Sequence, residues 1–365
     1  MNNTFFIENI EKRPEFFKSF NQIIQHINSK PMILFGAGKW GEYYLKVIKR
    51  YCSEIIFCDN SPLKWGTTIE GIPVISFDEV NRRYKDYFIT ITSLDYFEEI
   101  YELLESKKLE SRIVLPIAGF TKDEYRDFPE VINENKDKVS LVYNFLSDNR
   151  SKQIFTDRIN CCISGNPKYL IPLKSKTPQY FDPEIIKLTS HEVFVDGGGY
   201  TGDTVEEFVR QTKGEFKKLY SFEPEETKHI EFLKKFKGNE KIKLLPYGLW
   251  SSKDVFRFSG TNDGSSNINE DGNIEIPVDN VDRILNNEPI TFIKMDIEGA
   301  ELEALKGAEK SIKKYKPKLA ICVYHKPLDF IEIPLYLKSI VPEYKIYLRH
   351  YNINIYETVC YAVAD

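Results

Sequence analysis

Apolar residues in the first third of the chain follow helical spacing and then fall into short runs. Between residues 14 and 28 they recur every three or four positions, which predicts an amphipathic helix packed on the first domain. Apolar runs follow at 32–35, 55–58, around 74, 87–92 and 112–115, with helical patterns between most of them. Strands that alternate with helices predict a parallel sheet with helices on both faces. We therefore expect a Rossmann-like, doubly wound α/β domain over residues 1–120.

The pattern changes after residue 120 and then resumes. Residues 121–189 are polar, with helical stretches at 139–145 and 149–159, and are expected to connect the domains, lie against the second one and form part of its lid. A second series predicts strands at 193–196, 219–223, 242–246, 291–296, 318–324, 345–349 and 356–363. Stretches at 255–258 and 274–278 predict an inserted hairpin. Residues 190–365 thus form a second Rossmann-like domain, mostly parallel with an antiparallel edge.

Composition narrows the class of protein. Of 365 residues, 42% are hydrophobic and 29% charged, a globular balance. The net charge is -5 and basic residues are not concentrated, so nucleic acid is an unsuitable partner. Six cysteines without a C-x-x-C pair predict buried, reduced thiols. The N-terminus resembles no secretory signal, and no run reaches the roughly 20 apolar residues of a membrane span. A cytoplasmic enzyme is expected.

Glycines and acids gather at two strand ends of the second domain. Asp196 ends the first strand, and a turn follows that contains Gly197, Gly198, Gly199, Thr201, Asp203 and Thr204. Glycines let a backbone turn approach a nucleotide closely. Glu223, followed by Pro224, ends the next strand, where its carboxylate can accept both hydroxyls of a ribose. The alternative is a plain tight turn with a helix-capping glutamate, but an acid at each strand end favours a nucleotide site.

Further ionisable residues end the fourth and fifth strands. Lys294, Asp296 and Glu298 lie at the end of the fourth strand, and His325 lies at the end of the fifth. Ligands of open α/β sheets bind at the carboxyl ends of the strands, so these residues are candidates for chemistry. A structural or merely exposed histidine is the alternative for His325. Trp250, just past the third strand, is a candidate for stacking on a base, with a core position as the equal alternative.

These motifs resemble the FkbM-type methyltransferase family over residues 179–364. The family pattern D-x-G-A-x-x-G-D-T, then F-E-P, then D-x-E-G-x-E is matched in this order, with Gly199 at the usual alanine. The resemblance implies a class I fold that binds S-adenosylmethionine (SAM) and methylates a hydroxyl, commonly on a sugar or secondary metabolite. A small-molecule or glycan acceptor, such as a nucleotide-sugar in surface polysaccharide biosynthesis, is then expected.

The resemblance also directs roles within the site. Because the sulfonium is a good leaving group, the enzyme has to align the hydroxyl and accept its proton. Asp296 or His325 is expected to be the general base, with Glu298 and Lys294 orienting the acceptor. A divalent cation held by Asp296 and His325 is an alternative that the sequence does not require. The polar loop 264–267 and Asp279 form either an ordinary turn or part of the acceptor site.

The first domain carries a rival motif. Gly36, Gly38 and Gly41 follow a strand, and Asp59 comes about 20 residues later, as in dinucleotide-binding folds. An NAD-dependent oxidoreductase is therefore an alternative, although no catalytic constellation accompanies the fingerprint. Residues 57–60 and 71–74 also resemble the N-terminal domain of nucleotide-sugar acyltransferases. That resemblance implies either a bound nucleotide-sugar or a vestigial fold used for assembly into a homo-oligomer. A protein that binds a nucleotide-sugar without catalysis is therefore a third alternative.

Overall fold

The computed structural model divides the chain into two compact units. The described residues are 28–93, 95–109, 112–113, 128–164, 167–259, 267–268, 274–353 and 355–364. The N-terminal unit takes the described residues up to Lys136 together with 156–172 and 353–355, and the C-terminal unit takes the others. The helix predicted at 14–28, apart from Asn28, and the boundary predicted at residue 120 lie outside the described residues.

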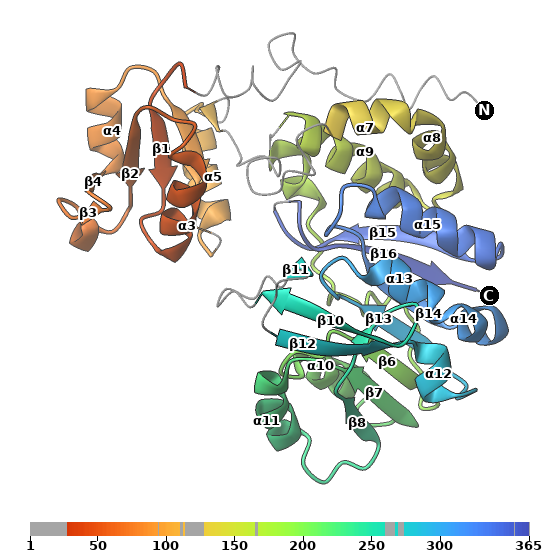
Figure 1. Cartoon of the computed structure of the whole chain (residues 1–365). Helices are drawn as coiled ribbons and strands as arrows, with labels where there is room; N and C mark the ends of the chain where they lie inside the picture. The colour runs from red at the N-terminus through yellow and green to blue at the C-terminus, as the bar shows by residue number, and fades with distance from the viewer. Residues whose placement is uncertain are drawn as a thin grey trace. The chain divides into compact units, whose positions relative to one another are not determined.

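The N-terminal unit contains a five-stranded sheet of order β3-β4-β2-β1-β5 (Figure 1). All its pairs are parallel except β3 with β4, which confirms the predicted parallel sheet. Of the last predicted strand, only residues 112–113 are described, and Ile113 forms a parallel bridge with Ile89. The elements are β1 (Met32–Phe35), α3 (Lys39–Ile48), β2 (Ile55–Cys58), η2 (Pro62–Lys64), β3 (Thr68–Ile69), β4 (Ile72–Ile75), α4 (Phe77–Arg83), β5 (Phe88–Ile91) and α5 (Phe97–Ser106).

Helices follow in the segment that was predicted to connect the domains. They are α7 (Phe128–Glu134), α8 (Lys136–Phe145), α9 (Asn149–Ser164), η5 (Pro167–Tyr169) and η6 (Ile171–Leu173), which confirms the helical stretches at 139–145 and 149–159. Within the C-terminal unit, Leu146 forms a bridge with Ile346, and Asp148 Oδ2 lies 2.8 Å from Arg349 Nη2. This part of the segment therefore lies against the second domain, as expected.

The C-terminal unit is built on a seven-stranded sheet of order β15-β16-β14-β13-β6-β7-β8 (Figure 1). Only β16 runs antiparallel to its neighbours, so the predicted antiparallel edge and class I methyltransferase fold are confirmed. The strands are β6 (Val193–Gly197), β7 (Lys218–Phe222), β8 (Ile242–Leu245), β13 (Phe292–Met295), β14 (Lys318–Cys322), β15 (Lys345–His350) and β16 (Thr358–Val363). The helices are α10 (Asp203–Gln211), α11 (Glu226–Lys235), α12 (Val281–Leu285), α13 (Glu301–Lys306), α14 (Glu309–Tyr315) and α15 (Asp329–Ile340).

The strand order places one crevice at β6. The chain proceeds from β6 outward through β7 to β8, and then returns to the other side of β6 at β13. At such a switch point the loops leave in opposite directions, so a ligand can enter between them. The turns that follow β6, β7, β13 and β14 all begin at this edge, because those strands are parallel.

The predicted hairpin belongs to a second, four-stranded sheet of order β11-β10-β12-β9. Strands β10 (Asp254–Ser259) and β12 (Ile274–Asp279) pair antiparallel, as predicted. The two-residue strands β9 (Gly248–Leu249) and β11 (Asn267–Ile268) were not predicted, because two residues show no hydrophobic period. Residues 264–266 of the polar loop lie outside the described residues.

Stacked aromatic rings form the core under the C-terminal sheet. The ring centroid of Phe194 lies 4.5 Å from that of Phe208 and 4.7 Å from that of Phe292. Phe181 joins them at 5.9 Å from Phe292. Burying each such ring contributes roughly 1.5–3 kcal/mol. This packing fixes the segment around Phe181, which enters the site described below.

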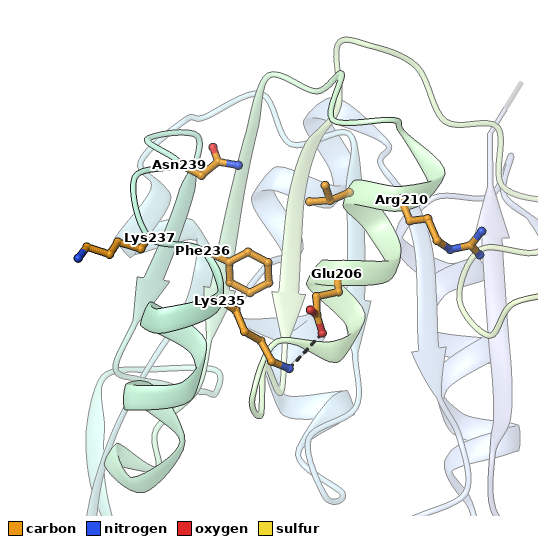
Figure 2. A pocket seen from close by; sticks show the side chains of 7 residues that line it. Glu206, Arg210, Lys235, Phe236, Lys237 and Asn239 are labelled. Atoms are coloured by element: carbon orange, nitrogen blue, oxygen red, sulfur yellow. Dashed lines mark hydrogen bonds and ion pairs between the residues drawn. The ribbon is translucent and has the colours of Figure 1, made fainter.

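An open groove of about 420 Å³ lies between α10 and α11 (Figure 2). Its lining includes Glu206, Phe236 and Lys235, whose ammonium lies 3.0 Å from the Glu206 carboxylate. None of the predicted site residues lines it. Within the described part of the chain, no helix is both long and apolar enough to span a membrane.

Candidate active site

The turn after β6 has a backbone that only glycine can adopt. Gly198 has φ +78°, and a Cβ there would lie 2.0 Å from the carbonyl oxygen of Asp296. Its N–H and that of Gly199 both donate to Phe222 O, at 3.0 Å each. Gly202 has φ +91° and precedes α10, where an added Cβ would meet the Phe236 ring at 2.5 Å. The turn is therefore held close to β7 and β13 by its lack of side chains.

The space beside Gly199 is smaller than the family resemblance suggested. A Cβ at Gly199 would lie 2.1 Å from Ser221 Oγ, which itself donates to Asp196 Oδ2 at 2.9 Å. The alanine that is usual at this position therefore requires Ser221 to move. In this chain the glycine and the serine act together, and the difference from the family pattern has a structural consequence.

Lys294 lies buried beneath the glycine turn. Its ammonium donates to Gly197 O at 3.0 Å and to Gly198 O at 2.9 Å, and lies 3.1 Å from Asp196 Oδ1. The side chains of Lys294 and Asp196 are 2% and 0% exposed. Burial disfavours the ammonium, but Asp196 and Asp296 outweigh burial and raise the pKa of Lys294 to about 12. The three contacts occupy the ammonium inside the turn, whereas the sequence placed it at the acceptor.

Glu223 joins the turn to the end of β7. Its carboxylate accepts the backbone N–H of Tyr200 at 2.8 Å and that of Glu225 at 2.8 Å. Burial raises the pKa of Glu223, although these two N–H groups oppose the shift. No ion pair to Glu223 is found in the described part of the chain. A ligand with hydroxyl donors would satisfy the remaining lone pairs of this carboxylate.

The other predicted cofactor residues surround the same turn. Thr201 is half-buried, Asp203 is exposed in the first turn of α10, and Thr204 is buried. Pro224 follows Glu223, and its ring approaches Gly248 of β9. Trp250 follows β9 and is half-buried, with its ring edge-on to Phe256 at 5.0 Å. That contact directs Trp250 toward the second sheet.

Asp296, Glu298 and His325 converge at the ends of β13 and β14, as predicted. His325 Nε2 lies 3.5 Å from Asp296 Oδ1 and 3.6 Å from Glu298 Oε2. The His325 side chain is 4% exposed, that of Asp296 26%, and that of Glu298 59%. The cluster is therefore buried at His325 and open to solvent at Glu298.

The charges of this cluster act on one another. Burial lowers the pKa of His325, but Glu301, Asp296 and Glu298 outweigh it and raise the pKa to about 9. Burial opposes ionisation of Asp296, but Lys294 and His325 lower its pKa below the ordinary value. Asp296 is therefore a carboxylate at neutral pH. The cluster concentrates negative charge around one imidazole.

Family models match both parts of the chain. Residues 196–351 match the methyltransferase FkbM domain, and residues 28–114 match the C2185-like N-terminal domain. The FkbM match lies entirely within the C-terminal unit. The glycine turn, Glu223 and the acidic cluster all lie within this match. The chain is thus a SAM-dependent methyltransferase, as the sequence predicted.

Solved structures are similar to this chain over all or about half of its length. A methyltransferase FkbM from Methylobacillus flagellatus is 23% identical, with a TM-score of 0.75 over 99% of this chain and 98% of that one. A putative Streptococcus mutans methyltransferase in complex with SAH is 14% identical, with a TM-score of 0.31 over 49% of this chain and 92% of that one. Aeropyrum pernix fibrillarin with bound SAM is 11% identical, with a TM-score of 0.33 over 49% of this chain and 70% of that one. No curated protein matches the chain.

Four residues that the sequence did not single out lie around the cluster of Asp296, Glu298 and His325. Tyr180 and Tyr324 donate their hydroxyls to Asp296, at 2.8 and 3.0 Å. Glu301 Oε1 lies 2.9 Å from His325 Nδ1. Burial and the nearby Asp296 raise the pKa of Glu357. Glu301 had a signal, as the last acid of the D-x-E-G-x-E segment, and Tyr324 directly precedes the predicted His325; Tyr180 and Glu357 come from distant parts of the chain.

Asp279, predicted as either a loop or an acceptor residue, is held by a neighbour. It is fully buried, and its Oδ1 accepts a hydrogen bond from Arg283 Nε at 2.6 Å. Arg283 Nη2 also contacts Asp279 Oδ2. The pair links β12 to α12, which favours a structural role.

Proposed function

We propose that this chain is a SAM-dependent O-methyltransferase whose acceptor is a hydroxyl of a sugar, a nucleotide-sugar or a glycan. The observation that carries the proposal is the convergence of Asp296, Glu298 and His325 beside the glycine turn. Lys294 and Asp296 belong to one strand end, so the cofactor turn and the cluster adjoin. A methyl donor in the turn would present its sulfonium toward carboxylates, which stabilise positive charge.

The cofactor is proposed to lie along the turn from Asp196 to Thr204. Glu223 would accept the ribose hydroxyls, since its carboxylate has lone pairs beyond the two backbone bonds. Trp250 remains a candidate for the adenine. We reassign Lys294 from the acceptor to the turn, because its ammonium contacts Gly197 O, Gly198 O and Asp196.

The transfer itself needs a proton acceptor. Asp296 would take the hydroxyl proton, because it is a carboxylate at neutral pH, whereas His325, with its pKa raised to about 9, already carries a proton there. Glu298, at the exposed side of the cluster, would orient the acceptor. The hydroxyl oxygen then forms the bond to the methyl carbon, and the carbon–sulfur bond breaks with its electron pair left on sulfur. General-base catalysis of this kind contributes about 10²- to 10⁴-fold.

The acceptor class rests on the family resemblance, and the location on the cysteines. All six cysteines are buried free thiols, which suits the reducing cytoplasm where SAM and sugar nucleotides are both present. The N-terminal unit would hold a nucleotide-sugar or support a homo-oligomer. An NAD site there has less support, since the Asp59 carboxylate already accepts Lys64 Nζ and Ala37 N, each at 2.8 Å.

Activity assays on hydroxylated sugars and sugar nucleotides, read out as SAH released, test this proposal. We expect Asp296→Ala and His325→Ala each to lower kcat by at least about 100-fold while SAM still binds. Glu303→Gln is the matched control, because Glu303 pairs with Lys306 on the same helix. If both alanine variants transfer methyl groups normally, the assignment is wrong. Calorimetry with NADH and a UDP-sugar separates the alternatives for the N-terminal unit.

A further inference from the structure

Two carboxylate oxygens lie beside one histidine nitrogen at the ends of β13 and β14. His325 Nε2 lies 3.5 Å from Asp296 Oδ1 and 3.6 Å from Glu298 Oε2. Ligands bound at about 2.0–2.2 Å in tetrahedral or octahedral geometry lie about 3–3.5 Å apart. Rotation of the exposed Glu298 side chain would bring its carboxylate onto an ion held by Asp296 and His325. Glu298, the most exposed of the three, leaves an open side for a further ligand.

The residues around these atoms orient them as a metal site requires. Glu301 Oε1 lies 2.9 Å from His325 Nδ1, which leaves Nε2 directed at the two acids. Glu301 is itself fixed, since its Oε1 accepts the N–H of Ile297 at 2.9 Å. Tyr180 and Tyr324 hold the Asp296 carboxylate from behind. Carboxylates on the far nitrogen of a histidine and hydrogen bonds to ligating acids are typical of metal centres.

Two further observations concern the buried acids of the cluster. Glu301 is fully buried, and its Oε2 has no hydrogen-bond partner in the described part of the chain. One ligand atom from each of Asp296, Glu301 and His325 lies within 4.8 Å of the others. Lys294, a buried ammonium, is directed to Asp196 and the glycine turn. The carboxylates beside His325 favour a cation at this place.

The backbone before the cluster is strained in a way that serves the site. Glu298 has φ +55° and is followed by Gly299 at φ +93°. A residue with a side chain pays a cost to adopt this left-handed conformation, and such strain is concentrated at functional sites. The Glu298 carboxylate that follows from this backbone lies 3.6 Å from His325 Nε2.

We propose that Asp296, Glu298 and His325 bind one divalent transition-metal ion of the Mn²⁺ or Zn²⁺ type, with Glu301 as the positioning residue. The mixed nitrogen and oxygen ligands favour these ions over Ca²⁺. The catalytic consequence rests on the proposed O-methylation. The ion would act as a Lewis acid toward an acceptor hydroxyl on its open side, and the hydroxyl proton would pass to water, because the Asp296 carboxylate would be occupied as a ligand. The oxygen then bonds to the methyl carbon as the carbon–sulfur bond breaks, with the electron pair left on sulfur.

Titration of the full chain with Mn²⁺ after chelation, in the presence of SAM, tests the site without any acceptor. We expect one Mn²⁺ per chain by calorimetry and electron paramagnetic resonance. Glu298→Gln, at an exposed position that cannot unfold the core, should weaken binding by at least about 10-fold, and so should Glu301→Gln. His325→Ala should abolish it, and Glu303→Gln should leave it unchanged.

Either of two results overturns the metal site: no bound Mn²⁺, or binding that is unchanged in both Glu298→Gln and His325→Ala. Methyl transfer that survives chelation undiminished also overturns its catalytic role and leaves the base mechanism in place. Failure of the proposed function looks different, because Mn²⁺ would then bind normally while no hydroxyl acceptor yields SAH.

Discussion

The two units of this chain each contain a glycine turn followed by an acid on the next strand, yet the two acids have different surroundings. In the N-terminal unit, Asp59 accepts the N–H groups of Ala37 and Ser61 and pairs with Lys64 at 2.8 Å. In the C-terminal unit, the Glu223 carboxylate accepts two backbone N–H groups and has no ion pair among the described residues. The carboxylate of Asp59 is thus paired with a cation inside its own turn, whereas that of Glu223 is not, and we propose that it binds a ligand.

The lysines differ in the same way. Lys64 approaches Asp59 from the surface, with 43% of its side chain exposed. Lys294 lies beneath the second turn with 2% exposed and bonds to two of its carbonyl groups. A glycine motif alone therefore does not distinguish the two turns, whereas the buried lysine under the second turn and the acids beside it do.

The largest expected effect comes from breaking the buried pair. Lys294→Met should destabilise the protein by about 3–5 kcal/mol, because the buried Asp196 loses its cation and two carbonyl groups lose their donor. Lys64→Met, the matching change in the first turn, should cost less than about 1 kcal/mol, as is typical of exposed pairs. Urea unfolding measures both. Equal losses would contradict the difference between the turns.

An intermediate effect is expected at the glycines. Gly198→Ala combines φ +78° with a Cβ 2.0 Å from Asp296 O, so the turn must move and SAM affinity should fall with stability. The expected loss of stability is roughly 1–3 kcal/mol. Gly38→Ala meets nothing within 4 Å and has an extended backbone, so it should change stability by about 0.5 kcal/mol or less. Thermal melts with and without SAM compare the two, and a harmless Gly198→Ala would refute the close approach.

The smallest expected effect is a difference between Asp59 and Glu223 in how each changes protein stability with pH. Burial opposes ionisation of Asp59, but Lys64 and two backbone N–H groups outweigh burial and lower the pKa of this carboxyl. Ionised Asp59 therefore stabilises the fold at pH values above its unfolded pKa, and this contribution is lost as the pH falls through the folded pKa. Burial raises the pKa of Glu223, so its contribution is present below its unfolded pKa and is lost as pH rises through the folded value. Without SAM, Asp59→Asn should therefore destabilise at pH 7 and not at pH 3, whereas Glu223→Gln should stabilise slightly at pH 7. Melts over this range measure both signs.

The sequence allowed the sheet and half of the site to be predicted. Strand ends in a parallel sheet meet at one edge, so Asp296 and His325 could be brought together from the hydrophobic pattern alone. The direction of a long side chain could not be predicted from this pattern. Lys294 was therefore placed at the acceptor, although its ammonium contacts the carbonyl groups of Gly197 and Gly198. Tyr180 could not be found either, because it reaches Asp296 from a loop far away in the sequence.

Calorimetric titration of SAM into the full chain is the most direct test of the central claim, that only the second turn is a working cofactor site. We predict one SAM per chain, with affinity reduced about 10- to 100-fold in Glu223→Ala, since hydrogen bonds to a charged group contribute about 1.5–3 kcal/mol. Asp59→Ala should bind SAM as the wild type does. Unchanged affinity in Glu223→Ala, or a loss in Asp59→Ala instead, would contradict the account.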